Sequence, residues 1–446
     1  MFNTIYQKFL KMKTKINTRN EENPRYVSFL LLKKIIKKKL KLNNELFKDK
    51  YFVKLSKKDK SFVKMLITVF IRRNGQANTI LALHLNKKPN SEVTILLKIG
   101  ITQIFFMDVS DYAAVDTTVE LTKKLNLNKF TSLVNAVLRK IANKKESLLP
   151  KTNIRNNFEI SFIKKLELNW GIENTKKILS LFMKIPPLDL TIIKNIKYWE
   201  KKLNGMILNK TTIRTNFSGD ISKMPGYKDL SWFVQDVAAS IPCKLFGEIS
   251  NKTVFDLCAA PGGKTIQLIL KNAKVTSVDI NQERLNILKD NLTRLNLKSN
   301  LVKENVLNFT PSQKADIILL DPPCTSSGVI RKNPDILLNN NFENLKNFQL
   351  LQINLLKKSL QLLKKDGILI FSTCSIFKEE GEDIIKQICE SKFAKLIPIK
   401  PNELGDFSNC AKPEGWVRIL PNSLSHENNS FEQGNDGFFI AKLKLI

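Results

Sequence analysis

The sequence predicts an all-α N-terminal domain, a small α+β connecting subdomain and a C-terminal α/β domain whose mostly parallel sheet is covered by helices on both faces. Three observations predict this. From Asn23 to about Lys145, apolar residues recur at helical intervals. After Asn251, short β-branched runs alternate with helical stretches. Between these two regions, Pro186-Pro187 ends a helical pattern and β-like pieces such as Leu188 to Ile193 follow.

We place the all-α domain at residues 20–148, the connecting subdomain at residues 149–242 and the α/β domain at residues 243–446. In the first domain, Asn23-Pro24 caps a helix whose lysines face solvent. A second helix runs from about Asp59 to Arg73 and is predicted to stop at Asn74-Gly75. Further helices are expected at Ser91 to Phe106, Tyr112 to Leu125 and Phe130 to Ile141.

The strands expected in the α/β domain are short and apolar: Thr253 to Leu257, Lys274 to Ile280, Asn300 to Lys303, Asp316 to Leu320 and Gly367 to Ser372. Helices are expected between them, at about Lys264 to Lys271, Gln282 to Leu295 and Phe348 to Leu363. Ligands of such sheets bind beyond the C-terminal ends of the strands. The residues that follow each strand are therefore the candidates for function.

The composition indicates a polyanionic partner. The chain has 73 Lys+Arg against 41 Asp+Glu, a formal net charge of +32. Nucleic acid is favoured over a membrane, because no apolar run approaches the roughly 18 to 20 residues that a bilayer-spanning helix needs. Most of the excess is lysine in a sequence also rich in Asn and Ile, so the charge alone does not decide the function.

The cysteines and histidines predict a metal-free cytoplasmic protein. Six cysteines without regular spacing suit a reducing compartment. The N-terminal stretch Met1 to Arg19 is basic and polar and lacks the apolar segment of an export signal. With only His84 and His426 and no Cys-x-x-Cys pair, we expect neither a metal site nor histidine-based acid/base catalysis.

A glycine-rich turn follows the first strand of the α/β domain. It reads Asp256-Leu257-Cys258-Ala259-Ala260-Pro261-Gly262-Gly263-Lys264. Small residues let the backbone approach a ligand, and the following helix offers free N–H groups, so we interpret it as a nucleotide-cofactor turn. It is not a P-loop, because Cys258 stands where that motif needs glycine. The alternative is an ordinary strand-to-helix turn.

Asp279 follows the second strand, where a carboxylate can accept both hydroxyls of a ribose. The alternative for such a residue is a turn or helix cap.

Two cysteines follow the fourth and fifth strands, at Asp321-Pro322-Pro323-Cys324 and Thr373-Cys374-Ser375. These strands are predicted to be neighbours, so the thiols should meet at one edge of the cofactor cleft. A disulfide and two inert core cysteines are the alternatives. The other three cysteines lack such a setting and are interpreted as filler: Cys243, Cys389 and Cys410.

Two adjacent thiols suit the chemistry of cytosine. A thiolate that adds to C6 makes C5 nucleophilic enough to take a methyl group from a sulfonium cofactor. A second thiol can then assist removal of the C5 proton and release of the first sulfur. Asp321 could hold the cytosine amino edge or the cofactor.

These motifs resemble the S-adenosylmethionine-dependent RNA 5-methylcytosine methyltransferases. The resemblance also includes Gly328 to Arg331, Gln235-Asp236 and the ending Asp436 to Phe439. In the helical domain, Val134 to Arg139 resembles the RNA-binding NusB-like domain. The combination is similar to bacterial 16S ribosomal RNA cytosine-5 methyltransferases. It implies a Rossmann-like catalytic domain with a mostly parallel seven-stranded sheet, S-adenosylmethionine as cofactor, and 16S ribosomal RNA as partner of a cytoplasmic monomer.

The resemblance also implies roles for single residues. Cys374 matches the nucleophile and Cys324 the releasing cysteine. The implied cofactor set is Cys258, Ala259, Ala260, Pro261, Gly262, Gly263, Lys264, Asp279, Asn305 and Asp321. Two positions depart from the family: Asn305 replaces the usual Asp, and Pro322 replaces a more common Ala.

Two other functions stay open on the sequence. An amino-group methyltransferase would use the Asp-Pro-Pro motif, but it needs an aromatic residue where this chain has Cys324, and it has no use for Cys374. A catalytically silent RNA-binding assembly factor would need neither cysteine nor the complete glycine turn.

Overall fold

The computed structural model describes residues 23–446 except 88, 218, 339–341 and 425–432. The predictions that concern Met1 to Arg19 and His426 lie outside the described residues. The chain forms two compact units. One holds the chain up to Lys165 and a segment that begins at Asn333, and the other holds Leu166–Lys332 and the chain from Asn341 to Ile446. Along the described residues, no helix has both the length and the apolar character to cross a membrane.

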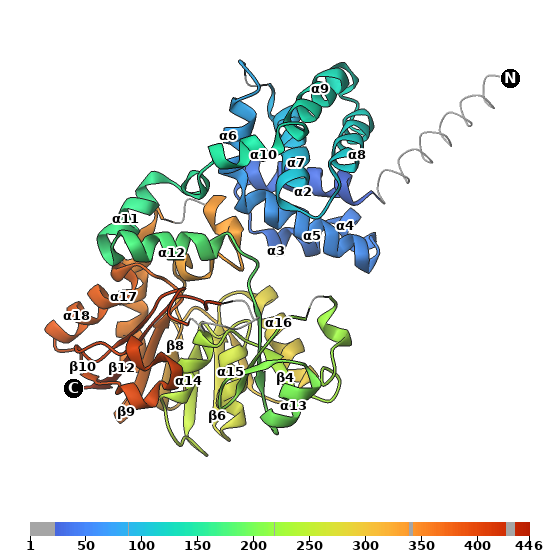
Figure 1. Ribbon diagram of the computed structural model, residues 1–446. Coiled ribbons are helices and arrows are strands. Elements are labelled where there is room, and N and C mark those ends of the chain that lie inside the picture. The colour runs from blue at the N-terminus through green and yellow to red at the C-terminus, as the bar shows by residue number, and fades with distance from the viewer. Residues whose placement is uncertain (1–22, 88, 218, 339–341, 425–432) are drawn as a thin grey trace, which may run out of the picture. The chain divides into compact units, whose positions relative to one another are not determined.

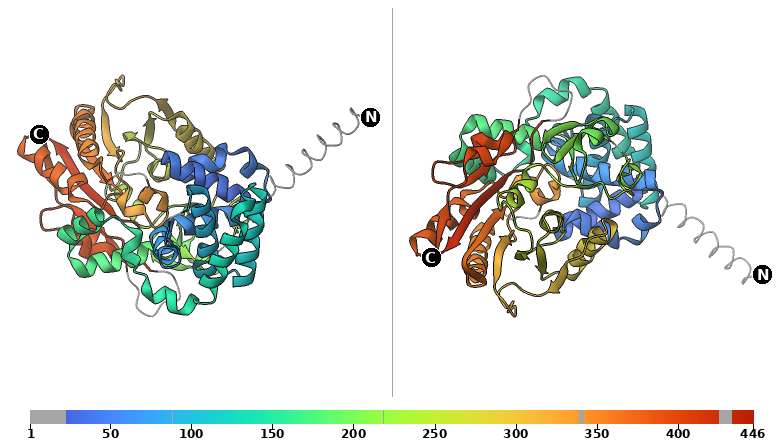
Figure 2. Two further views of the ribbon diagram at one scale, coloured as in Figure 1. Left: turned by 90° about the horizontal axis from the view of Figure 1, so that it is seen from above. Right: turned by 90° about the horizontal axis from the view of Figure 1, so that it is seen from below.

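The first unit is built from helices, seen from two opposite sides in blue to teal in Figure 2. They are α2 (Pro24–Lys38), α3 (Leu42–Lys48), α4 (Lys50–Lys54), α5 (Lys57–Arg72), α6 (Asn74–Ala82), α7 (Ser91–Phe106), α8 (Asp111–Lys124), α9 (Thr131–Ala142) and α10 (Lys145–Leu148). As predicted, Asn23 caps α2 by accepting from the backbone N–H groups of Arg25 and Tyr26. Helix α7 is buried along most of its length and contributes to both apolar clusters of the unit.

As predicted, α5 ends before Asn74-Gly75, at Arg72, but these two residues form no turn, because α6 begins directly at Asn74. Gly75 serves a close contact instead. A Cβ atom at Gly75 would lie 1.7 Å from the backbone oxygen of Asn156, in the 3-10 turn η3 (Ile154–Asn157). The glycine therefore follows the end of α5 and also marks packing against a distant segment.

The second unit begins within α11 (Ile160–Trp170), continues through α12 (Ile172–Phe182) and then forms a small antiparallel sheet in the order β2-β3-β1-β4. Its elements are β1 (Leu188–Ile192), α13 (Ile196–Lys202), β2 (Met206–Asn209), β3 (Thr212–Thr215) and β4 (Trp232–Val234). Arg214 on β3 and Asp189 on β1 form a buried ion pair with an Nε–Oδ1 distance of 2.7 Å. The α+β character predicted after Pro186-Pro187 is thus present.

The large sheet of the second unit has the order β10-β12-β9-β8-β5-β6-β7, and β11 pairs with β12 beside this path. Its strands are β5 (Thr253–Leu257), β6 (Lys274–Asp279), β7 (Asn300–Lys303), β8 (Ala315–Leu320), β9 (Leu363–Thr373), β10 (Ala394–Ile397), β11 (Val417–Ile419) and β12 (Phe438–Leu445). The pairs that join β9, β8, β5, β6 and β7 are parallel, and the pairs of β12 are antiparallel. The predicted fold class is confirmed, with the three-residue β11 as an eighth strand where seven are predicted.

Helices cover both faces of this sheet: α14 (Ile241–Lys244), α15 (Gly263–Leu270), α16 (Gln282–Arg294), α17 (Leu345–Gln361) and α18 (Glu382–Glu390). One apolar cluster joins strand residues such as Ile318 to α17 and α18, and a second joins alternate strand residues such as Ile317 to α14 and α15. In Figure 1, α17 and α18 lie at the orange and red end of the sheet, and α15 and α16 at its yellow-green end. Because β5, β6, β8 and β9 run parallel, the residues that follow them gather at one edge.

Candidate active site

The glycine-rich turn joins β5 to α15. Cys258 and Gly262 have φ values of 63° and 103°, the left-handed region that favours glycine. A Cβ atom at Gly262 would lie 2.7 Å from Cγ of Leu288 on α16. The N–H of Ala259 donates to the carbonyl of Val278 at 3.1 Å. The turn is thus packed tightly between β6 and α16, and α15 begins directly after it with free N–H groups at its N-terminus.

Asp279 lies at the end of β6 and is tied to the turn. Its Oδ2 accepts from the N–H of Ala260 at 3.1 Å, and its Oδ1 accepts from the N–H of Asn281 at 3.0 Å. The N-cap of α16 is Asn281, whose side chain accepts from the N–H of Arg284. The helix-capping role considered for Asp279 therefore belongs to Asn281.

Asn305 follows β7 and is half-buried. Its Oδ1 accepts from the N–H of Leu307 at 3.1 Å. One acceptor of this amide is therefore already used within the loop.

The two predicted cysteines lie side by side. Sγ of Cys324 is 3.4 Å from Sγ of Cys374, and both are free, half-buried thiols. A disulfide would need an S–S distance of about 2.05 Å, so the two sulfurs touch without a bond. They come from neighbouring parallel strands, since Cys324 follows β8 and Cys374 follows β9. By contrast, Cys243 and Cys410 are buried in an apolar cluster.

The two thiols are not equivalent. The hydrogen bond to Cys374, followed by burial and the charges of Cys374, Glu380 and Asp321, raises the pKa of the Cys324 thiol well above its ordinary value. Cys324 therefore keeps its proton at neutral pH, and either thiol can be the donor of the hydrogen bond between the two sulfurs.

Lys264, the last residue of the glycine-rich motif, forms an ion pair with Asp321, with an Nζ–Oδ2 distance of 2.5 Å. Burial lowers the pKa of Lys264, but the Asp321 carboxylate outweighs this effect, so the pKa lies above its ordinary value and the ammonium persists. The charge of Cys374 also contributes to this rise, which places the cation within electrostatic reach of that sulfur. A cation in this position favours the thiolate form of a nearby cysteine.

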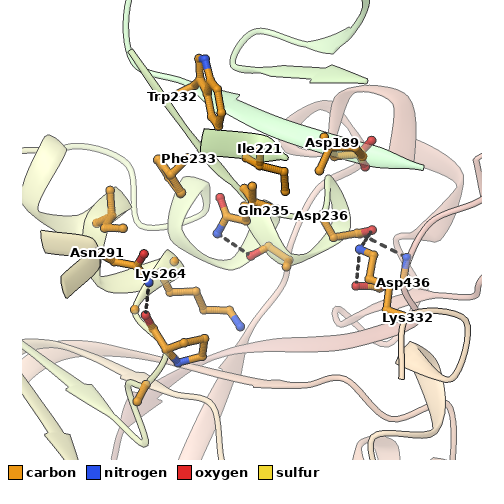
Figure 3. Close-up of a pocket in the computed structure, with 18 of the residues that line it drawn as sticks. Asp189, Ile221, Trp232, Phe233, Gln235, Asp236, Lys264, Asn291, Lys332 and Asp436 are labelled. Atoms are coloured by element: carbon orange, nitrogen blue, oxygen red, sulfur yellow. Dashed lines mark hydrogen bonds and ion pairs between the residues drawn. The ribbon is translucent and has the colours of Figure 1, made fainter. Parts of the chain in front are cut away.

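A cavity of about 670 Å³ opens beside the turn. Cys258 to Lys264 and Asp321 line one side, and aromatic side chains of the connecting region, including Trp232 and Phe233, line the other (Figure 3). The lining drawn from the described residues does not include Cys324, Cys374, Asp279 or Asn305. Of the predicted residues, the turn and Asp321 thus line this cavity, while the thiol pair, Asp279 and Asn305 lie outside its lining.

Three charged residues of the cavity wall have no role in the sequence prediction. Lys332 lies between Asp236 and Asp436, with Nζ–Oδ2 distances of 2.5 and 2.9 Å, as Figure 3 shows. They come from three distant segments, which this network joins. Both aspartates belong to sequence motifs that resemble the methyltransferase family. Lys332 belongs to no such motif, and the sequence does not distinguish it as buried among the many lysines of this chain.

The residues fit S-adenosylmethionine. The left-handed glycine turn leaves backbone N–H groups open at the start of α15, and carboxylates stand at the ends of β6 and β8 as acceptors for ribose hydroxyls and an ammonium group. Among the described residues, no three His, Cys, Asp or Glu side chains cluster closely enough to hold a metal ion.

Known proteins are similar to this chain over both of its predicted main domains. The family described as 16S rRNA methyltransferase RsmB/F matches residues 246–444, and the NusB family matches residues 22–143. Ribosomal RNA small subunit methyltransferase B of Klebsiella pneumoniae (strain 342) is 28% identical over 455 residues, covering 97% of this chain and 99% of that protein. The protein of the same name from Xylella fastidiosa (strain 9a5c) is 25% identical over 406 residues, covering 86% and 92%.

The crystal structure of PH0851 has the same fold, with a TM-score of 0.72 at 22% identity over 95% of this chain and 98% of that one. The cofactor of the catalytic domain is S-adenosylmethionine. The chain is therefore similar to the NusB family in its N-terminal part and to the RsmB/F family of 16S rRNA methyltransferases in its C-terminal part.

Proposed function

We propose that this protein methylates C5 of a cytosine in 16S ribosomal RNA through a covalent bond between Cys374 and C6 of the base. The contact of 3.4 Å between two free thiols at the strand edge carries the proposal. The relatives are named ribosomal RNA small subunit methyltransferase B, which supports small-subunit ribosomal RNA as the substrate.

The reaction uses the two sulfurs in turn. The thiolate of Cys374 forms a bond to C6, and the electron pair of the C5–C6 double bond moves to C5. When bound by the turn from Cys258 to Lys264 and Asp321, S-adenosylmethionine would supply the methyl group to C5, with its sulfonium sulfur becoming a neutral thioether. A base then takes the C5 proton, the C5–C6 double bond re-forms, and the C6–S bond breaks to return the Cys374 thiolate.

Cys324 fits the role of that base. In the free enzyme its proton is held by the hydrogen bond to Cys374. Once the Cys374 sulfur is bonded to C6, it carries no charge and that hydrogen bond weakens. The two causes of the raised pKa of Cys324 that come from Cys374 then end, so Cys324 can release its proton to water and, as a thiolate, accept the proton from C5.

Lys264 and Asp321 support the nucleophile and the ligands. The Lys264 ammonium favours the thiolate of Cys374, and the Asp321 carboxylate accepts from either the cytosine amino group or the cofactor. We assign cofactor binding to the turn from Cys258 to Lys264, with Asp279, Asn305 and Asp321. Asn305 offers an amide where a carboxylate is usual, which weakens the hydrogen bond it can accept.

The rest of the chain would bind RNA. A net charge of +32 and the NusB-family domain favour phosphate contacts that position the substrate, while a base taken out of its stack enters the cleft. We further propose that the protein acts in the cytoplasm as a monomer on RNA with few bound proteins, where the base is accessible.

Two variants test the mechanism. Cys374→Ala should abolish methyl transfer and form no adduct, because no sulfur attacks C6. Cys324→Ala should accumulate a covalent RNA adduct, seen as a retarded band on a denaturing gel, because release lacks its base. Cys389→Ala changes a half-buried thiol of α18 and should behave like the unmodified protein.

Failure of Cys324→Ala to form an adduct, with its fold intact, would contradict the assigned roles. Methyl transfer to an exocyclic amino group by the Cys374→Ala variant would instead favour an amino-group methyltransferase. No methyl transfer by the unmodified protein, together with tight RNA binding, would favour an assembly factor.

A further inference from the structure

Glu380 is a buried carboxylate that the mechanism above does not use. It ends the 3-10 turn η8 (Lys378–Glu380), just after β9, and its side chain is 0% exposed. Among the described residues, no Lys or Arg side chain forms an ion pair with it. A carboxyl group in such a place is costly unless several hydrogen-bond donors satisfy it.

Those donors come from the loop that carries Cys324. Oε1 of Glu380 accepts from the N–H of Thr325 and from Nε2 of Gln352, each at 2.9 Å. Oε2 accepts from the hydroxyl of Thr325 at 2.5 Å. The same Nε2 of Gln352, on α17, donates to the carbonyl of Pro323 at 2.8 Å. The residues on both sides of Cys324 are therefore fixed by Glu380 and its partner Gln352.

The loop that carries Cys374 contacts Glu380 and its partner Thr325. The hydroxyl of Thr373 donates to the backbone carbonyl of Glu380 at 2.9 Å. The Ser375 hydroxyl lies 3.3 Å from the hydroxyl of Thr325, which bonds to the Glu380 carboxylate. The residue before Cys374 thus contacts Glu380, and the residue after it contacts Thr325.

Other contacts between the two loops do not involve Glu380. The N–H of Gly328 donates to the carbonyl of Cys374 at 2.9 Å, and the N–H of Ile376 donates to the hydroxyl of Ser327 at 3.0 Å. They keep the loops adjacent, but they join Cys374 and Ile376 to residues that lie four and three positions beyond Cys324. Loss of Glu380 should therefore loosen the position of Cys324 without separating the strands.

We propose that Glu380 is a positioning residue that holds the Cys324 sulfur against Cys374, so that Cys324 can act in the release step. The proposal rests on the proposed C5 methylation, which it deepens. Glu380 contacts neither the base nor the cofactor in this scheme and acts through the loop of Cys324.

The first test compares Glu380→Ala with Glu380→Gln. Alanine removes every hydrogen bond of the carboxylate, so it should slow turnover at least 10-fold and accumulate the covalent RNA adduct, as Cys324→Ala does. Glutamine keeps an acceptor for the Thr325 N–H and offers an N–H to the Thr325 hydroxyl, which can rotate to accept. It should restore turnover to within about 3-fold of the unmodified protein and leave no adduct.

The matched control is Glu390→Ala, an exposed glutamate at the end of α18. It should leave turnover and adduct unchanged. A residue that only stabilises the fold would not give an adduct, because an unfolded enzyme does not attack C6. Normal turnover by Glu380→Ala, or slow turnover with no adduct in a folded protein, would overturn the proposal.

A second measurement needs no RNA and separates this proposal from the methylation itself. Dibromobimane becomes fluorescent when it links two neighbouring thiols, so its reaction with the Cys324–Cys374 pair reports their proximity. Glu380→Ala should react at least 5-fold more slowly than Glu380→Gln and Glu390→Ala. Equal rates in all three would overturn the proposal, even if the Cys324→Ala adduct supports the proposed function.

If Glu380→Ala does not fold, the Thr325→Val variant tests the same proposal. This substitution removes the hydroxyl that joins Glu380 to Ser375 and keeps the Thr325 N–H. Slower bridging and adduct accumulation would support the proposal, and unchanged bridging and turnover would overturn it.

Discussion

Asp256 carries an ionisable group at a buried position behind the glycine-rich turn. Its side chain belongs to β5, is 1% exposed and accepts from the hydroxyl of Thr265 on α15. Burial raises the pKa of Asp256 from its ordinary value of 3.8 to about 7, although the Thr265 hydroxyl and Lys264 oppose the rise. The group therefore joins β5 to α15 and also makes the stability of the domain depend on pH.

The sign of this dependence follows from proton linkage. Between pH 4 and pH 7, the folded protein keeps the Asp256 proton while the unfolded chain has lost it. The free energy of unfolding contributed by this group is therefore largest below about pH 4 and falls as the pH rises to about 7. The side chain of the Asp256→Asn variant cannot ionise. Its free energy of unfolding should therefore not show this decrease with pH, which is on the order of a few kcal/mol. Urea unfolding at pH 4.5 and pH 7.5 measures the difference, and an equal change in both proteins would contradict the prediction.

Single residues of the site differ in how far the sequence could predict them. The proximity of Cys324 and Cys374 could be predicted, because each follows one of two neighbouring parallel strands. The structure places their sulfurs 3.4 Å apart. Lys332 and Glu380 could not be found in this way. Their importance comes from burial and from partners distant in sequence, and neither property leaves a local pattern.

At the scale of elements, the glycine-rich turn combines two constraints at Gly262. Its φ of 103° disfavours any side chain, and a Cβ atom would also meet Leu288 at 2.7 Å. Gly247 has a φ of 70° and nothing within 4 Å of its Cβ position, so it shares only the first constraint. Substitutions at Gly262 and Gly247 therefore separate the cost of a positive φ from the effect of packing between α16 and the turn.

Gly262→Ala should weaken S-adenosylmethionine binding at least 10-fold, because the displaced turn no longer presents its N–H groups. It should also lower stability by more than the roughly 1 to 2 kcal/mol that a left-handed alanine costs. Gly247→Ala should show only that cost and normal cofactor binding. Titration calorimetry and thermal unfolding measure both, and equal cofactor affinity in the two variants would contradict the role of the turn.

The length of an element decides how well its sequence predicts it. Long helices such as α7 and strands between clear turns such as β5 match their expected bounds. Helices α3 and α4 have only 7 and 5 residues, and β11 has 3, which is too short for a period to show. The end of α5 before Asn74-Gly75 was predictable from the sequence, but the packing of Gly75 against Asn156 was not, because Asn156 belongs to a distant segment.

At the scale of the whole molecule, the net charge of +32 predicts how RNA binding responds to salt. Each phosphate contact releases counterions, so the binding constant falls as salt rises. With about four contacts to single-stranded RNA, raising salt from 50 to 200 mM should weaken binding about 50-fold. Fluorescence anisotropy with a labelled ribosomal RNA fragment measures the affinity at each salt concentration. An affinity that does not change with salt would contradict the prediction that the protein binds RNA through phosphate contacts.

The central claim is that Cys374 attacks C6 of a cytosine while Cys324 releases it. RNA that carries 5-fluorocytosine tests it most directly, since a base cannot remove fluorine from C5 as it removes a proton, and the enzyme stays attached. Digestion and peptide mass spectrometry of the trapped complex should place the nucleotide on the peptide that contains Cys374. Attachment to Cys324, or no attachment at all with cofactor and RNA bound, would contradict the claim.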